Sequence, residues 1–330
     1  MTLQHFTIAD LQRALHEGEL SAREIARQTL DDIARVNPQI NAWTEVTAQR
    51  MLAEADSIDA LRREKRPLPP LAGIPYAVKN LFDVAGHTTL AGAELLSDRP
   101  PAASDSWAVR QLHSAGALLS GMLNMDAYAY GFTTENSYYG ATRNPARSVA
   151  DRRRFFRRFG PRRWRPGWFI SASAATTNGS IRVPASLCGI FGLKPTFGRL
   201  SRSGSHPFVA SLDHIGPFAR RVTDLAAVYD ALQGRDPADD FQADKASERT
   251  GNLLERGLEG LRCARLGGYF TTWCDDDARA AVDRVAQRAG RRQRAAVRGC
   301  RAGPLGGLYH QRQRRRQSVP GGSSPLARAL

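Results

Sequence analysis

The sequence has few of the residues that build metal sites or disulfide frameworks. Its four cysteines show no paired spacing, and its seven histidines are scattered singly, without an HxH or HExxH pattern. A chain of 330 residues is also far above the size at which a domain needs disulfide cross-links. We therefore expect free thiols in a reducing compartment, no metal site and no cofactor.

Long apolar runs are missing as well. No run approaches the roughly 18 residues that a membrane-spanning helix needs. The first residues, MTLQHFTIADLQRAL, lack the basic-then-apolar layout of a secretory signal. With 42% hydrophobic and 24% charged residues, the composition is that of a globular protein. These features predict a cytoplasmic protein with one large domain or two smaller ones.

Acidic side chains are absent from two strongly basic blocks. Residues 152–166 contain eight arginines and no acid, and residues 288–330 contain eleven arginines and no acid. Removing these nineteen arginines from the net charge of +15 leaves the rest of the chain at −4. The first block, DRRRFFRRFGPRRWRPGW, interleaves arginine with aromatic residues. Such a pattern could hold phosphates and stack bases, so an arginine-rich nucleic-acid-binding protein is one hypothesis.

Between these blocks the pattern is that of an α/β protein. Capping-box spacings at Thr7 and Ser21 predict two helices near the N-terminus, and a third is expected over about 46–62. The segment GIPYAVKN is typical of a buried strand. The segment DSWAVRQLHSAGALLSGMLNM predicts a helix, a glycine turn and another strand. A helix over 221–234, with Gly234 as its C-cap, continues this alternation, which favours a core sheet.

Two residues could carry nucleophilic chemistry. Lys79 ends an apolar strand, where burial would lower the pKa of its amine and let it accept a proton, unless the side chain reaches solvent. Ser180 follows a glycine in TTNGSIRVPAS, where a tight loop could turn several backbone N–H groups toward an oxyanion. An ordinary Gly-Ser turn is the alternative. Because no histidine lies in a triad arrangement, lysine is the available base.

Three segments resemble the amidase signature family of serine hydrolases, and they occur in the family's order. They are LAGIPYAVKNLFDVAGHTTLAG, NMDAYAYGFTTENSYYGATRNP and NGSIRVPASLCGIFGLKPTFGRLSRSGSHPFVASLDHIGP. The resemblance covers roughly residues 5–148 and 177–287. The last segment is most similar to the branch of 1-carboxybiuret and biuret hydrolases, and the A-type component of glutamyl-tRNA amidotransferase is a near relative.

The resemblance implies a mixed twisted sheet surrounded by helices. A single, C-terminally truncated amidase domain is expected over residues 1–330. N-terminal helices would occupy 1–65 and the catalytic core 66–287, with an aberrant segment at 150–176. The tail over 288–330 is expected to be aberrant and disordered.

The resemblance also implies hydrolysis of a small, biuret-like carboxamide by a Ser–cis-Ser–Lys mechanism. Lys79 matches the family's base and Ser180 its nucleophile. The backbone of Thr177, Asn178 and Gly179 matches the oxyanion hole. The implied partners are a small amide substrate, a second copy of the chain, and a small helical protein similar to the C-type component of the amidotransferase.

The arginine-aromatic block falls where the family places its middle serine, in a loop reading Gly-Gly-Ser-Ser-Gly-Gly-Ser-Ala. Phe155 and Phe156 stand at the two serine positions, and Thr176 replaces the aspartate usual before the nucleophile. Codons allowed for RRRFFRRFG, read one base out of register, give Ala-Gly-Gly-Ser-Ser-Gly-Gly-Ser-Ala. The tail segment YHQRQRRRQSVPG permits a shifted reading similar to a substrate-pocket segment. We interpret 150–176 and the residues after about 287 as frameshifted. This interpretation disfavours nucleic-acid binding, and we expect the chain as it stands to be inactive.

The coding DNA across codons 148–178 tests this interpretation directly. We expect TTC at Phe155 and Phe156, and codons ending in GG at Arg154 and Arg157, because these give serine and glycine in the shifted frame. Sequencing of both strands is the measurement. A TTT codon at either phenylalanine, or an arginine codon without the GG ending, would contradict the frameshift.

Overall fold

The computed structural model describes residues 3, 6–144, 171–177, 179–258, 260–261, 263–266, 269–272, 274–288 and 293–295. The expected positions of the middle serine at Phe155 and Phe156, and the expected oxyanion residue Asn178, lie outside these residues. So does most of the 288–330 tail. The chain divides into two compact units, Met1–Gly251 and Asn252–Leu330, which are described separately below.

Three helices open the first unit: α1 (Ile8–Glu17), α2 (Ala22–Ile40) and α3 (Ala48–Arg63). Both predicted capping boxes are present. The Thr7 hydroxyl accepts a hydrogen bond from the amide of Asp10, whose carboxylate accepts from the amide of Thr7, and Ser21 and Glu24 pair in the same way. The N-terminal helices are thus confirmed, together with the local interactions that start them.

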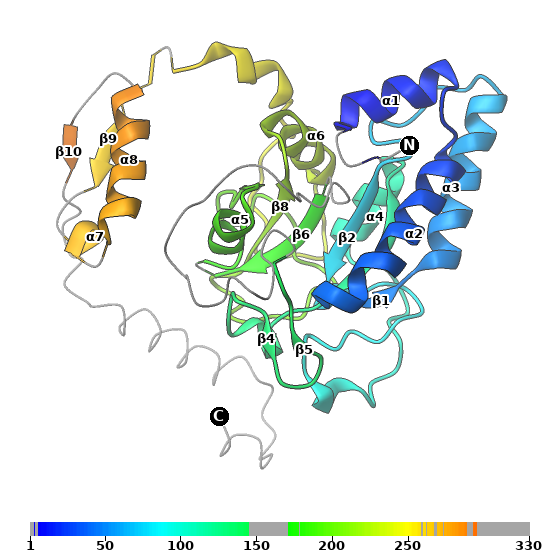
Figure 1. The fold of residues 1–330 in the computed structure, drawn as a ribbon, viewed down its shortest axis with the longest axis horizontal. Coiled ribbons are helices and arrows are strands. Elements are labelled where there is room, and N and C mark those ends of the chain that lie inside the picture. Colours follow the sequence, from blue (N-terminus) through cyan, green and yellow to red (C-terminus); the bar gives the residue numbers. More distant parts are fainter. Residues whose placement is uncertain are drawn as a thin grey trace. The chain divides into compact units, whose positions relative to one another are not determined.

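The core of the first unit is a six-stranded mixed sheet in the order β1-β3-β2-β6-β8-β7 (Figure 1). Strands β3, β2 and β6 run parallel to one another, and the outer pairings are antiparallel. The mixed sheet expected from the family resemblance is confirmed. Its strands are β1 (Trp43–Val46), β2 (Pro75–Lys79), β3 (Leu118–Leu123), β6 (Ser171–Thr176), β7 (Phe191–Gly192) and β8 (His214–Ala219).

Strand β6 contains residues that the frameshift hypothesis assigns to the aberrant segment. Ser171 pairs with Tyr76 of β2, and Thr176 pairs with His214 of β8. Residues 171–176 therefore have a regular place between two strands, and the segment outside the described fold is 145–170.

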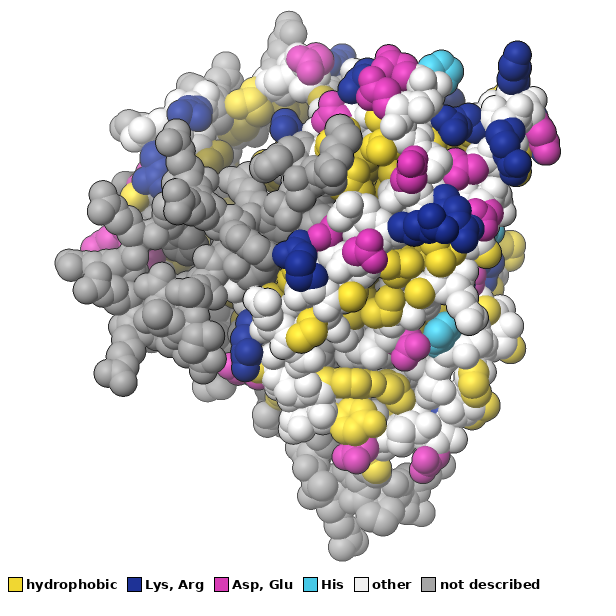
Figure 2. Space-filling model, turned by 45° about the vertical axis from the view of Figure 1, so that its right-hand side comes forward, with side chains coloured by type: hydrophobic (Ala, Val, Ile, Leu, Met, Phe, Trp, Pro, Cys, Tyr) yellow, Lys and Arg dark blue, Asp and Glu magenta, His cyan; other side chains and the backbone are white. Residues whose placement is uncertain are grey.

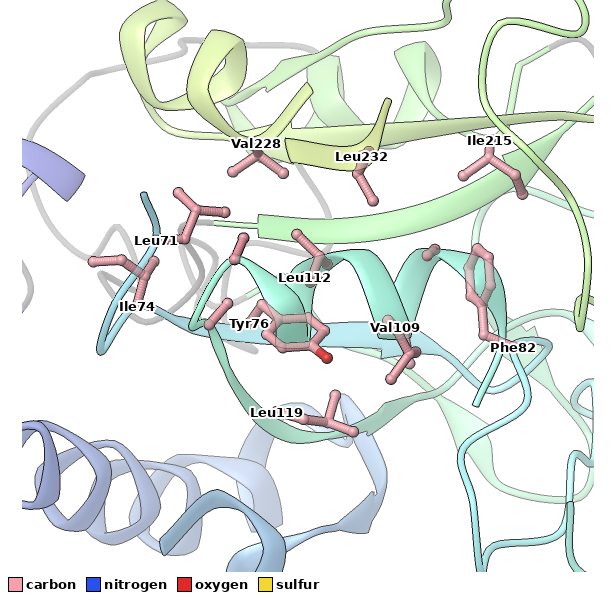
Figure 3. Close-up of a cluster of buried hydrophobic side chains, with 14 of the residues drawn as sticks. Leu71, Ile74, Tyr76, Phe82, Val109, Leu112, Leu119, Ile215, Val228 and Leu232 are labelled. Carbon is pink, nitrogen blue, oxygen red and sulfur yellow. The ribbon is translucent and has the colours of Figure 1, made fainter. Parts of the chain in front are cut away.

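Helices cover both faces of the sheet. Consecutive residues of a strand point to opposite faces, and Leu118 and Leu119 of β3 show this. Leu118 packs with residues of α1, α2 and α3. Leu119 belongs to the core cluster that also contains residues of α4 (Trp107–Ser114) and α6 (Val222–Leu232); Figure 3 shows Leu119 beside Tyr76 and Val109, and the α6 side chains Val228 and Leu232 on the side of Leu112. Strand β2 is consequently buried over Pro75–Val78, and only Lys79 at its end is partly exposed.

Two boundaries differ from the sequence expectations. Helix α6 has Gln233 as its C-cap, and the predicted cap Gly234 follows with φ 136°. Strand β1 was not expected. It approaches β3 so closely that a Cβ atom on Gly121, where φ is 151°, would lie 2.1 Å from the Glu45 carbonyl oxygen. Only glycine allows this pairing.

Short elements complete the two units. In the first they are η2 (Glu94–Leu96), η3 (Ala127–Ala129), β4 (Glu135–Asn136), β5 (Gly140–Ala141) and α5 (Arg182–Cys188), and η5 (Gly251–Arg256) begins at the unit boundary. The second unit contains β9 (Ala264–Leu266), α7 (Tyr269–Thr272), α8 (Asp276–Arg288) and β10 (Gln293–Ala295), with β10 parallel to β9. Three residues of the expected aberrant tail thus form a strand.

The surface in Figure 2 carries Lys and Arg side chains interspersed with Asp and Glu, rather than a patch of one sign. On the N-terminal helices, Arg13 pairs with Glu17 at 2.6 Å. This face therefore has the mixed charge expected for the body of the chain. Within the described residues, no helix combines the length and apolarity needed to cross a membrane.

A buried ionic network ties α3 to the sheet. Arg50 donates to Glu54 at 2.8 Å and to both carboxylate oxygens of Asp105 at 2.7 Å. The second oxygen of Glu54 accepts the backbone amide of Leu119 at 2.7 Å, and its first lies 3.1 Å from His113. One carboxylate therefore joins α3, α4 and β3.

Replacing Glu54 should be costly for this reason. Glu54→Ala removes one of the two carboxylates that pair with Arg50 and leaves the buried Leu119 amide without its acceptor, and we expect a loss of about 1–3 kcal/mol in the free energy of unfolding. The exposed Glu64, whose pair with Arg66 is 3.5 Å long, serves as the control. Glu64→Ala should change stability by less than about 0.5 kcal/mol. Urea titration measures both, and equal effects would refute the role given to the network.

Candidate active site

Lys79 is the last residue of β2 and is held by a strand that is otherwise buried. Among the described residues its ammonium has no hydrogen-bond or ion-pair partner. Burial lowers its pKa from 10.5 to about 8, and the negative charge of Asp126 opposes this shift. A lysine with this pKa has a neutral fraction near neutral pH and can act as a base.

Ser180 lies in the turn between β6 and α5. It is buried, with 8% of its surface exposed, and its hydroxyl donates to the carbonyl oxygen of Gly131 at 3.4 Å. The preceding residue, Gly179, accepts the amide of Val183 at 2.8 Å, which begins the turn into α5. A Cβ atom on Gly179 would lie 3.1 Å from a Val183 methyl group and 3.7 Å from the Phe132 ring.

The sheet brings Lys79 and Ser180 to the same edge. Strands β2 and β6 are parallel neighbours, with Val78 opposite Ser173, so their carboxyl ends lie side by side. Lys79 closes the first strand, and Ser180 follows the end of the second. Strand β3 is parallel to β2 on its other side, and it leads into the segment that carries Asp126. The carboxyl ends of parallel strands are where α/β proteins place their sites.

Asp126 is a residue that the sequence reasoning missed. Its carboxylate accepts the backbone amides of Thr134 at 2.9 Å and Glu135 at 3.1 Å, closing a loop over 126–136. It also lies directly against Gly131, where a Cβ atom would be 2.6 Å from the Asp126 carboxyl carbon. The motif NMDAYAYG contains Asp126, but only three-dimensional contacts connect it to Lys79 and Ser180.

The 126–136 loop is strained and firmly held. Tyr128, Ala129 and Thr134 have φ values of 55°, 57° and 57°, a region that costs such residues about 1–3 kcal/mol each. Buried Asn136 anchors the end of the loop. Its side-chain amide donates to the carbonyl oxygens of Met125 and Gly92 at 2.7 Å, while its oxygen accepts two amides of the following turn. Strain of this kind concentrates at functional sites.

The other expected site residues are only partly accounted for. Thr177 and Gly179 lie in the turn before Ser180, whereas Asn178 and the middle-serine positions lie outside the described residues. The described residues contain no group of three metal-ligating side chains. A surface cavity of about 580 Å³ lies elsewhere, against α2 and β5, and includes none of Lys79, Asp126 or Ser180.

Comparison with known proteins defines the class. The profile of the amidase family matches residues 24–150 and 169–297. The chain belongs to the amidase family, and it has the amidase signature fold. The stretch between the two matched parts, 151–168, is the arginine-aromatic block.

Particular relatives narrow the comparison. The chain is 48% identical over 280 residues to AtzE of Pseudomonas sp. (strain ADP), which is named as a component of 1-carboxybiuret hydrolase, and the match covers 83% of this chain and 60% of that protein. It is 36% identical over 299 residues to the A-type component of glutamyl-tRNA(Gln) amidotransferase from Moorella thermoacetica (strain ATCC 39073 / JCM 9320), covering 86% of this chain and 58% of that protein. The chain thus spans about three fifths of the length of these relatives.

Solved structures agree with this placement. A structure described as a vestigial protein complex that reveals the evolutionary origins of an s-triazine catabolic enzyme matches with a TM-score of 0.82 and 44% identity, over 89% of this chain and 64% of that chain. The native peptide amidase of Stenotrophomonas maltophilia matches with a TM-score of 0.73 and 28% identity, over 89% of this chain and 62% of that chain.

Because burial lowers the pKa of Lys79, replacing this lysine by an uncharged residue should stabilise the folded chain by an amount that depends on pH. Because the amine is harder to charge in the folded state, the unfolded chain binds the extra proton between about pH 8 and 10.5, and wild-type stability rises with pH there. Lys79→Met should therefore be more stable than wild type at pH 7, by about 1–3 kcal/mol after allowance for screening. This advantage should shrink above pH 8.

Urea unfolding at pH 7 and pH 10 measures the effect. Lys245→Met, at an exposed position, is the matched control and should leave stability unchanged at both values. An advantage of Lys79→Met that stays constant with pH would mean that the pKa of Lys79 is not lowered.

Proposed function

We propose that the chain derives from an amide hydrolase that acts on small, biuret-like carboxamides through Lys79 and Ser180. The observation that carries this proposal is the position of both residues at one sheet edge, joined through Asp126 and Gly131. Identity of 48% to a component of 1-carboxybiuret hydrolase, against 36% to the A-type component of an amidotransferase, supports the hydrolase over the amidotransferase alternative.

The proposed reaction is acyl transfer through a serine ester. Neutral Lys79 takes a proton from a bridging serine hydroxyl, which takes one from Ser180, and the Ser180 Oγ forms a bond to the amide carbon. Backbone N–H groups over 177–179 hold the oxyanion. The C–N bond breaks as the amine receives the proton, and water then hydrolyses the ester to release the acid and restore Ser180.

The bridging hydroxyl is the component that the chain as it stands does not supply. Phe155 and Phe156 occupy its expected positions in the sequence, and a phenyl ring neither donates nor accepts a proton. The family profile skips 151–168 and resumes at 169, which supports a local shift of reading frame in this block. We propose that the frame-restored sequence is the active enzyme.

The proposal extends to compartment and assembly. Cys188, Cys263 and Cys274 are free thiols, which supports the cytoplasm as the compartment. One relative is named as one component of a larger enzyme, and one matched structure is described as a complex. These names support a partner chain for this protein as well, and we propose the second copy and the small helical protein that the family resemblance implies.

Activity of the two versions tests the proposal. The frame-restored chain should hydrolyse biuret-like and aryl amides, and the chain as it stands should be slower by at least about 10⁴-fold. Misplacement of the nucleophile by an ångström lowers the rate by about a hundredfold. Loss of proton transfer removes a further 10²–10⁴-fold or so. Ammonia or aniline release under identical conditions is the measurement.

Ser180→Ala in the restored chain is the control for contaminating amidases, and it should abolish turnover. Equal rates from both versions would show that the serine bridge is not needed. If the restored chain folds but hydrolyses none of these amides, the proposed function is refuted.

A further inference from the structure

The 126–136 loop lies between the two residues of the proposed catalytic pair. We propose that Asp126 is a positioning residue that acts on both, holding the hydrogen-bond acceptor of Ser180 in place and supplying the negative charge that faces Lys79. Its meaning for catalysis rests on the proposed amide-hydrolase function. Its effects on the loop and on Lys79 do not.

The contact with Ser180 passes through the main chain of Gly131. The Ser180 hydroxyl donates to the Gly131 carbonyl oxygen at 3.4 Å. The α-carbon of Gly131 lies against the Asp126 carboxylate, with the carboxyl carbon and both oxygens 2.6–2.9 Å from where a Cβ atom would be. A side chain at position 131 would displace either the Gly131 main chain or the Asp126 carboxylate. The position of the Gly131 carbonyl oxygen therefore depends on the Asp126 carboxylate.

The same carboxylate fixes the shape of the loop. Its two oxygens accept separate backbone amides, those of Thr134 and Glu135. A carboxylate can accept at both oxygens, whereas an asparagine side chain has one acceptor and would turn its NH₂ toward an N–H. The loop geometry therefore depends on both carboxyl oxygens of Asp126, which help to hold the left-handed backbone at Tyr128, Ala129 and Thr134.

The contact with Lys79 is electrostatic. The neighbouring strands β3 and β6 contain no titratable side chain. Among the charged groups of the described residues, Asp126 is the one that acts on the Lys79 amine, and it does so against the effect of burial. Removing its charge should lower the pKa of Lys79 further, and the fraction of neutral lysine at a given pH should rise.

Three substitutions separate these two effects. Asp126→Asn removes the charge and one acceptor. Asp126→Glu keeps the charge but lengthens the side chain, and Gly131→Ala keeps Asp126 but forces it and the loop apart. Glu135→Gln, which removes an exposed charge from the same loop, is the matched control.

The first measurement uses the full chain as it stands and needs no activity. The acetylation rate of Lys79 with acetic anhydride is followed against pH by peptide mass spectrometry, with Lys245 as the internal standard. We expect Asp126→Asn to shift the Lys79 midpoint downward by about one pH unit. Glu135→Gln should leave the midpoint within a few tenths of a unit of wild type, and Asp126→Glu and Gly131→Ala, which keep the Asp126 charge but displace it, should shift the midpoint less than Asp126→Asn does.

The second measurement uses the frame-restored chain and its amide hydrolysis against pH. Asp126→Asn should move the acidic limb of kcat to lower pH and reduce its maximum. Gly131→Ala should reduce kcat by about tenfold or more and move the limb less than Asp126→Asn does, because it displaces the acceptor of Ser180 while the Asp126 charge is kept. A role in stability alone would move neither the limb nor the acetylation midpoint.

The outcomes are distinguishable. An unmoved acetylation midpoint in folded Asp126→Asn refutes the action on Lys79. If that variant does not fold, Asp126→Ser, which also removes the charge, takes its place, and an unmoved midpoint refutes the action in the same way. Wild-type kcat in Gly131→Ala refutes the action on Ser180. A restored chain without activity contradicts the proposed function, while a shifted midpoint would still support the effect of Asp126 on Lys79.

Discussion

The parallel pairing of β2 with β6 is the constraint on which the candidate site depends. Each strand ends in a residue or turn with reactive groups, and parallel register places the two ends at one edge. Burial of β2 between helices on both faces supplies the second ingredient, because it takes the Lys79 amine partly out of water. The position of Lys79 and its lowered pKa thus both follow from the packing of β2, and neither depends on a hydrogen-bond partner of the lysine.

Local signals in the sequence were sufficient for the elements whose interactions are local. The capping boxes at Thr7 and Ser21 and the buried run that forms β2 each depend on residues a few positions apart. Lys79 and Ser180 could be singled out because their motifs are short. Strand β1 and the role of Asp126 could not be predicted from the sequence, because they depend on contacts with segments that are distant along the chain. Gly121 against the Glu45 carbonyl, and Asp126 against Gly131, are visible only once the chain is folded.

Bulk charge was a poor guide to function in this chain. The net charge of +15 suggests a partner of opposite sign, but the described face carries both signs and the arginines gather in two blocks. One block coincides with the stretch that the family profile leaves unmatched. Charge becomes informative when it is read against position in the fold. Because the first block falls between the two matched parts of the family profile, its position supports the proposed shift of reading frame over a binding surface.

The contacts described for Lys79, Asp126, Gly131 and Ser180 are made by residues on either side of the 145–170 segment. Under the proposed mechanism the fold serves as an acceptor scaffold in engineering terms, with Lys79 as the base, Ser180 as the nucleophile and the 145–170 segment as an exchangeable insert. Different inserts that present a hydroxyl, an imidazole or a carboxylate could be compared on one fixed background, so that the contribution of the bridging group is measured separately from that of the scaffold.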